Sequence, residues 1–321
     1  MGHECFDVST EGPVAHLRLK RGDEPDTMTP AFWHELPAIV REIDREGSAR
    51  AIVISSTGRH FSAGMDLGVF TGGSGGGVGS STGEQGRRRA NLRLGVRELQ
   101  ESFTCLERAR VPVLAAVQGG CIGGAVDLVT ACDLRYATAD AFFCVQEINI
   151  GMTADVGTLQ RLPKLIPEGV AREWAYTGDR IPAQRAYEVG LVNGVFDDHE
   201  SLVAGAIEVA QRIATKSPLA IWGTKEMITY ARDHSTEDAL NYIATWQTGM
   251  FQPADMLESF AAKTEKRDPD YDDLLPVEPP LCRNRTEGLR FRSVSPRRVG
   301  GTRSRGRRHG RGWTTPNPPC R

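Results

Sequence analysis

The stretch from Val113 to Asp127 reads VLAAVQGGCIGGAVD, and it is the most informative part of the chain. Its first five residues are β-branched or small and apolar, which predicts a buried strand over 113–117. Glycines then interrupt the apolar run, and a helix is expected to start near Gly123 or Gly124. Because the first backbone N–H groups of a helix have no partner within it, this turn can stabilise an oxygen that gains negative charge.

Two common phosphate-binding loops do not fit this turn. A dinucleotide fingerprint requires G-x-G-x-x-G, but Cys121 stands two residues after Gly119. A P-loop requires Lys after its last glycine, where Ala125 stands. The turn is therefore either an anion-stabilising turn or a structural one that packs a helix closely on a sheet.

A second segment has the same character. Residues 51–55 (AIVIS) predict a strand, and the small residues of FSAGMDL (61–67) follow it. Two such turns on neighbouring parallel strands would direct two N–H donors at one oxygen. Enzymes stabilise an oxyanion or enolate with this arrangement.

Together, HFSAGMDL and AAVQGGCIGGAVDLVTACDLRYA resemble the crotonase, or enoyl-CoA hydratase/isomerase, superfamily, and the resemblance covers about residues 5–270. It implies an α/β fold, a crotonase-like spiral of β-β-α turns with a C-terminal helical oligomerisation region. It also implies an oxyanion hole for an acyl-CoA thioester, formed by the backbone N–H groups of Met65 and Gly124. The substrate-binding residues that it implies are Ala63, which lies near CoA through its backbone, Gly64 and Gly123.

Within this superfamily, acids that project into the acyl pocket decide the reaction. The chain carries Asp127 in GGAVDL, Glu147 in FFCVQEINIG and Asp155 in MTADVGTLQRLPK. Hydratases of the superfamily typically have glutamates at the first two positions and no acid at the third. The Asp at the first position and the additional Asp155 resemble the Δ3,5-Δ2,4-dienoyl-CoA isomerases, which implies a place in β-oxidation of unsaturated fatty acids.

The resemblance implies a role for each acid in a 1,5-proton shift. The shift removes a proton at C2 and adds one at C6, and one carboxylate cannot easily reach both carbons. Glu147 is assigned to C2 and Asp155 to C6, with the reverse assignment left open. Asp127 is expected to tune the other two acids or to hold a water. Burial and mutual repulsion would raise the pKa of such acids toward the range useful for proton transfer.

Each acid also has a structural interpretation. Asp155 could be the N-cap of a short helix that follows it, and Glu147 could be a solvated charge at a strand end. Asp127 lies between apolar residues of the predicted helix, where an acid needs a partner or a function. Asp133 and Arg135 are expected to form a structural ion pair.

The 321 residues, 40% of them hydrophobic, suit one large core with an appended helical region. Strands over 14–19, 51–55 and 113–117 are expected to alternate with helices over 31–45, 91–110 and 125–131, followed by helices over 202–214, 218–231, 236–250 and 254–264. We expect the spiral core over 1–200, a helical trimerisation region over 201–275 and a disordered basic tail over 276–321. The resemblance implies a homotrimer or homohexamer, and Leu240, Ile243 and Trp246 would supply its apolar contacts, although packing within the chain produces the same periodicity.

Composition also restricts the compartment and the cofactors. The sequence contains no run of eighteen apolar residues, so no membrane span is expected. No targeting segment is recognised at either end. Seven scattered cysteines without a C-x-x-C pair indicate a reducing, cytoplasmic compartment. The histidines form no cluster with metal-ligand spacing, so no metal is expected. No cofactor is expected either, because coenzyme A is part of the substrate.

Two segments fall outside the superfamily pattern. A flexible Gly-rich loop is expected over 71–90, either as a lid at the pocket mouth or as a plain insertion, and its Arg87–Arg89 could meet CoA phosphates or start a solvated helix. Residues 282–321 contain twelve arginines and one acid, hence a charge of +11, which leaves −13 on residues 1–281 of a chain whose total is −2.

Two alternative functions follow from these observations. Enoyl-CoA hydration would need a water between Asp127 and Glu147 and would leave Asp155 idle. An RNA-associated protein on a crotonase scaffold would use the basic tail for phosphate contacts. A tail without an evolved role is the third interpretation of residues 282–321.

Overall fold

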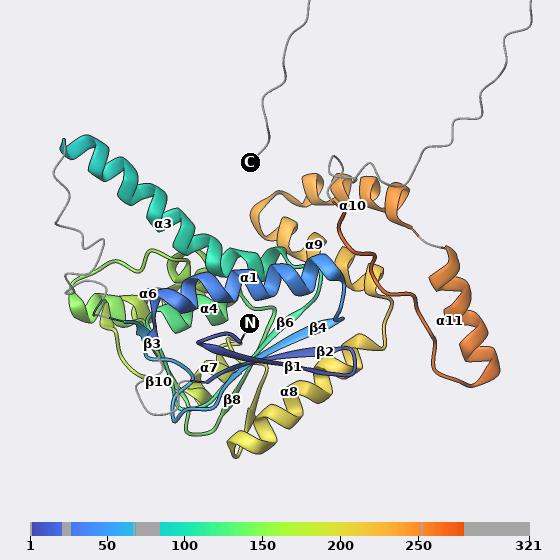
Figure 1. Ribbon diagram of the computed structural model, residues 1–321, viewed down its shortest axis with the longest axis horizontal. Helices are drawn as coiled ribbons and strands as arrows, with labels where there is room; N and C mark the ends of the chain where they lie inside the picture. Colours follow the sequence, from blue (N-terminus) through green and yellow to red (C-terminus); the bar gives the residue numbers. More distant parts are fainter. Residues whose placement is uncertain (1, 21–26, 67, 69–83, 252, 279–321) are drawn as a thin grey trace, which may run out of the picture. The chain divides into compact units, whose positions relative to one another are not determined.

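The structure is a computed structural model that describes residues 2–20, 27–66, 68, 84–251 and 253–278 (Figure 1). An antiparallel hairpin opens the chain, and from its second strand onward strands alternate with helices. The elements of this first half are β1 (Phe6–Glu11), β2 (Val14–Leu19), α1 (Pro30–Glu46), β4 (Ala51–Ser56), α3 (Gln85–Arg108), β6 (Val113–Val117), α4 (Gly124–Ala131) and β8 (Leu134–Thr138). The predicted alternation is confirmed, and the strands over 14–19 and 113–117 match to the residue.

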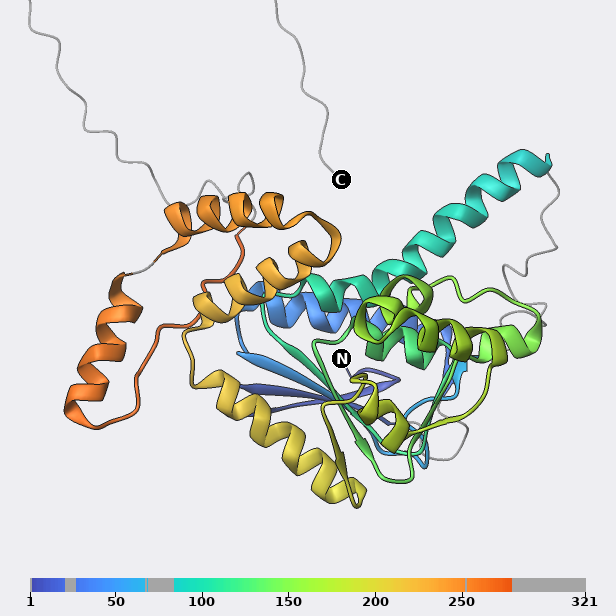
Figure 2. The ribbon, with the colours of Figure 1, turned by 180° about the vertical axis from the view of Figure 1, so that it is seen from behind.

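The largest sheet has six strands in the order β1-β2-β4-β6-β8-β11, the last being Gly194–Phe196. Every pair after β1-β2 is parallel, as expected for strands joined by helical crossovers. Helix α8 (His199–Ala214) covers one face, and α1 lies on the opposite face in both views (Figures 1 and 2). The larger core lies between the sheet and α1, α3 and α4, where Phe32, Phe103 and Ile54 are buried.

Short strands follow the long ones and form a second layer. β7 (Gly120–Ile122) and β9 (Phe142–Cys144) pair in parallel, with β10 (Ile181–Pro182) at the edge. β3 (Thr27–Met28) pairs with β5 (Gly64–Met65), and a bridge between Ser62 and Cys121 connects the two small sheets. A long strand, a short strand and a helix therefore repeat, which is the expected spiral of β-β-α turns.

The second half of the chain is mostly helical. Its elements are the 3₁₀ turn η1 (Gln146–Ile150), α5 (Thr158–Leu165), α6 (Glu168–Thr177), α7 (Ala183–Glu188), α8, α9 (Pro218–Asp233), α10 (Thr236–Met250) and α11 (Pro253–Glu265). Trp246 of α10 packs edge-on against Trp222 of α9, with ring centroids 5.1 Å apart. Leu240 of the same helix is 63% exposed. The apolar positions predicted for oligomer contacts therefore divide between packing within the chain and the surface.

The regions outside the superfamily pattern are described only in part. The predicted loop over 71–90 is wrong at its carboxyl end, because α3 already begins at Gln85. The side chain of Glu84 accepts hydrogen bonds from the N–H groups of Gly86 and Arg87, and this cap starts the helix earlier than the glycines indicate. Residues 71–83 of that loop, with the suggested lid, and residues 279–321 of the predicted tail lie outside the described residues. The predicted start of the disordered tail at 276 is wrong, because the N–H of Val277 still donates to the carbonyl oxygen of Arg45 at 2.7 Å. No helix in the described part of the chain is long and apolar enough to cross a membrane.

Candidate active site

The two glycine turns meet at the amino end of α4. Gly64 has a φ of +83°, and a Cβ on it would lie 2.6 Å from the carbonyl oxygen of Ile122 and 3.2 Å from the nitrogen of Gly124. A Cβ on Gly124 would in turn lie 3.8 Å from the nitrogen of Met65. Glycine is therefore required at position 64, and the backbone nitrogens of Met65 and Gly124 lie close together. Gly123, with a φ of +55°, precedes the helix, and the first N–H groups of a helix have no partner within it.

A cavity of about 1130 Å³ opens at this meeting point, between α1, α3 and the two turns. Its size suits a large organic ligand. All five residues predicted to form the oxyanion hole or to bind substrate line it: Ala63, Gly64, Met65, Gly123 and Gly124. Two arginines that the sequence did not single out, Arg41 and Arg180, also line it, whereas Arg87–Arg89 do not. The guanidinium of Arg180 lies over the ring of Phe142, 4.6 Å from its centroid.

Glu147 and Asp155 both line this cavity, Glu147 from η1 and Asp155 from the segment between η1 and α5. Burial raises the pKa of Glu147, and the negative charge of Asp155 raises it further. Its Oε2 is buried and has no hydrogen-bond partner among the described residues, so the interpretation of Glu147 as a solvated charge is wrong. Asp155 lies at the open side of the cavity, where partial burial raises its pKa as well.

Asp127 does not line the cavity but lies beneath it, fully buried in α4. Its Oδ1 accepts a hydrogen bond of 2.5 Å from the backbone N–H of Thr158, the first residue of α5. Its Oδ2 has no partner within the described chain. Burial, followed by the charge of Glu147, raises the pKa of Asp127 to about 7. This buried acid is therefore within electrostatic reach of the cavity without being exposed to it.

The contact between Asp127 and Thr158 also bears on whether Asp155 is the N-cap of α5. The residue before α5 is Gly157, with a φ of +139° and no side-chain cap. The first N–H group of this helix is bound by a side chain from another helix, so the interpretation of Asp155 as the N-cap is wrong. Sequence reasoning missed this contact because the two residues are 31 positions apart.

The expected ion pair between Asp133 and Arg135 is also wrong. Oδ2 of Asp133 instead lies 2.7 Å from Nζ of Lys225 in α9. The buried Lys225 also donates to the carbonyl oxygens of Leu106 and Val111. Arg135 donates to backbone carbonyl oxygens, among them that of Leu191 at 2.6 Å. The cation that pairs with Asp133 thus comes from the C-terminal helices, and a pattern of neighbouring residues in the sequence could not predict this pair.

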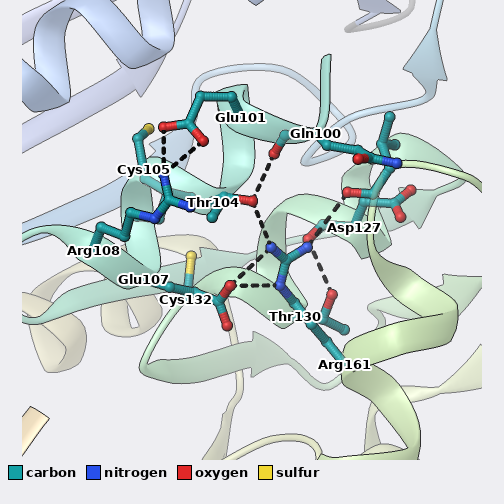
Figure 3. A network of polar contacts seen from close by, with 12 residues as sticks. Gln100, Glu101, Thr104, Cys105, Glu107, Arg108, Asp127, Thr130, Cys132 and Arg161 are labelled. Atoms are coloured by element: carbon teal, nitrogen blue, oxygen red, sulfur yellow. Dashed lines mark hydrogen bonds and ion pairs between the residues drawn. The ribbon is translucent and has the colours of Figure 1, made fainter. Parts of the chain in front are cut away.

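A polar network that sequence reasoning did not find connects α3 to Arg161 of α5 (Figure 3). Arg161 of α5 donates to Oε2 of Glu107 at 2.8 Å and to Oγ1 of Thr104 at 3.0 Å. Nε2 of Gln100 donates to the carbonyl oxygen of Asp155 at 2.8 Å. Gln100, Thr104 and Glu107 follow a spacing of four and three residues, which places them on one face of a helix. That spacing was the available signal in the sequence.

Comparison with known proteins agrees with this site. Residues 9–274 match the family described as Enoyl-CoA hydratase/isomerase. The chain is 42% identical over 263 residues to a human protein named mitochondrial Δ(3,5)-Δ(2,4)-dienoyl-CoA isomerase, covering 81% of this chain and 79% of that protein. It is 37% identical over 269 residues to a peroxisomal protein of the same enzyme name from Arabidopsis thaliana, covering 84% and 96%. Among solved structures, an enoyl-CoA hydratase from Bacillus anthracis is 31% identical, with a TM-score of 0.74 and coverage of 84% and 99%.

Proposed function

This chain belongs to the enoyl-CoA hydratase/isomerase family, and on that premise we propose that it converts 3,5-dienoyl-CoA thioesters into 2,4-dienoyl-CoA thioesters. The observation that carries the proposal is the presence of two carboxyl groups, Glu147 and Asp155, in one cavity beside the paired glycine turns. Relatives named dienoyl-CoA isomerase match this chain over most of its length. The reaction would serve the β-oxidation of unsaturated fatty acids.

In the first step, the carboxylate of Glu147 takes a proton from C2. The electron pair of the broken C–H bond forms a C1=C2 double bond, and negative charge moves to the thioester oxygen. The N–H groups of Met65 and Gly124 donate to this oxygen, where they stabilise the trienolate more than the uncharged substrate. The unpartnered Oε2 of Glu147 supplies an acceptor for the proton.

In the second step, the thioester carbonyl reforms and the electron pairs move along the chain, giving double bonds at C2=C3 and C4=C5. C6 takes its proton from the carboxyl group of Asp155. Glu147 ends protonated and Asp155 ends ionised, and exchange with solvent restores both. The raised pKa of each group favours this use, because a proton donor and acceptor work best near the operating pH.

The proposed chemistry uses no cofactor, since coenzyme A is part of the substrate. We further propose that the chain works as a homotrimer or homohexamer. Large apolar side chains exposed on the C-terminal helices support this, among them Ile228, Leu240, Leu257 and Phe260. Sedimentation of the purified chain at the mass of a monomer would contradict it.

We also place the chain in the cytoplasm. Four described cysteines (Cys105, Cys121, Cys132 and Cys144) are free thiols, as in a reducing compartment. The names of the similar proteins place those proteins in mitochondria or peroxisomes. Fluorescence imaging of the tagged full-length chain in its own cells is expected to show a diffuse cytoplasmic signal, and an organellar signal would overturn this part of the proposal.

Absorbance assays test the reaction, because a 2,4-diene conjugated with the thioester absorbs at longer wavelength than a 3,5-diene. The wild-type protein is expected to convert 3,5-dienoyl-CoA, and Asp155→Asn to abolish that activity while the protein stays folded. Turnover of 2-enoyl-CoA alone, with no effect of Asp155→Asn, would instead establish a hydratase.

A further inference from the structure

We propose that Gln100 is a positioning residue that holds Asp155 at the distance needed to protonate C6. This inference rests on the proposed function, because it concerns the acid assigned to the second proton transfer. Gln100 stands in the half-buried part of α3, and its amide donates to the carbonyl oxygen of Asp155 at 2.8 Å. No other side chain in the described chain is hydrogen-bonded to the Asp155 backbone.

The segment from 153 to 156 needs such a contact because regular structure does not hold it. Among the described residues, these four make no hydrogen bond from backbone to backbone. Met152, just before them, donates to the carbonyl oxygen of Glu147 at 2.9 Å, and α5 begins just after them at Thr158. Side chains that reach the segment from the neighbouring helices therefore fix its course.

Packing of the neighbouring residues sets the orientation of the Asp155 side chain, and the contact with Gln100 sets the position of its backbone. Ala154 and Val156 on either side are buried in the core, each 4% exposed. Asp155 between them is exposed and lines the cavity, so the burial of its two neighbours is consistent with a side chain held away from the core. The amide of Gln100 then sets how far the backbone at Asp155 stands from α3.

The same face of α3 anchors the following residues. Arg161 donates to Thr104 and Glu107 of α3 (Figure 3). It also donates to the carbonyl oxygen of Val156 at 3.4 Å. Helix α3 also lines the acyl cavity through Leu92, Val96 and Leu99. Helix α3 therefore supplies both a wall of the cavity and the side chain of Gln100, which is hydrogen-bonded to the residue that carries the acid for C6.

The test follows the fate of the trienolate in D₂O. Once C2 has lost its proton, the trienolate either gains a deuteron at C2 or is protonated at C6 to give product. Misplacing Asp155 slows only the second route. We expect Gln100→Met, which keeps the length but removes the donor, to lower kcat by about 10- to 100-fold with KM unchanged. The ratio of C2 exchange to product is expected to rise by the same factor.

Two further variants make the outcome decisive. Gln100→Glu replaces the donor by an acceptor in the same shape and is expected to act like Gln100→Met. Gln85→Met, an exposed position on the same helix, serves as the matched control and is expected to behave as wild type. Unchanged kcat in both Gln100 variants, or an equal loss of exchange and of turnover, would overturn the positioning role. Failure of the wild type to convert 3,5-dienoyl-CoA would instead overturn the proposed function, and this inference with it.

Discussion

Replacing Asp127 by Asn is expected to change how the stability of the protein depends on pH. The carboxyl group of Asp127 is fully buried, and its pKa is raised to about 7 from an ordinary value near 3.8. Between these two values the folded state keeps the proton and the unfolded chain releases it. The folded state therefore binds more protons in this window, and the free energy of unfolding falls as the pH rises through it.

The size of the effect follows from the shift. One pKa unit corresponds to about 1.4 kcal/mol, so Asp127 removes roughly 4 kcal/mol of stability between pH 4 and pH 8. The Asp127→Asn variant would lack this titration, while its amide oxygen still accepts the hydrogen bond from Thr158. The stability of the variant relative to wild type should therefore rise with pH up to about pH 7 and then level off.

Urea denaturation of both proteins at several values from pH 5 to pH 8 measures this difference directly. Glu147 and Asp155 titrate in both proteins, so their contributions largely cancel in the comparison. Asp140→Asn, at an exposed position, is the matched control and should follow the wild type. Parallel stability curves for wild type and Asp127→Asn would refute the argument, because the buried carboxyl would then not hold a proton near neutral pH.

Two further substitutions test the support of the site. Lys225→Met should lower the free energy of unfolding by about 3 kcal/mol, because it leaves the carboxylate of Asp133 and two carbonyl oxygens without their donor. Urea denaturation measures this loss. A loss below about 1 kcal/mol would show that the ion pair contributes no more than an ordinary surface pair. Gly64→Ala should cost about 1–3 kcal/mol and lower kcat, because position 64 has a positive φ and its Cβ would clash with the carbonyl of Ile122. Gly169→Ala in α6, where a Cβ meets nothing within 4 Å, is the control, and equal kcat and stability for the two variants would contradict the close approach of the turns.

Local pattern predicted the long central strands and most helices, but it missed β1 and α6 and placed the start of α3 too late. The strand over 113–117 and the helix over 236–250 match their predicted bounds. The strand is marked by an unbroken apolar run and the helix by a helical period, and both patterns can be recognised within one short stretch of sequence. The short strands β5 and β7 were not predicted, since two or three residues carry no period. Their pairing depends on where the longer strands end in space.

The candidate site was predictable where a motif carries it. The glycine turns, Glu147 and Asp155 were found in the sequence, and the structure places them along one cavity. Contacts between distant elements were not predictable in this way. The cap from Asp127 to Thr158 and the pairing of Lys225 with Asp133 span 31 and 92 residues, and both partners look ordinary in their own segments.

The division of labour between the two acids is tested most directly by incubating 3,5-dienoyl-CoA in D₂O with Glu147→Gln and with Asp155→Asn and locating deuterium by NMR. We expect Glu147→Gln to lose both C2 exchange and product formation, whereas Asp155→Asn should keep C2 exchange and form no product. If Asp155→Asn still forms 2,4-dienoyl-CoA with deuterium at C6, Asp155 does not supply that proton and the two-carboxylate mechanism is wrong.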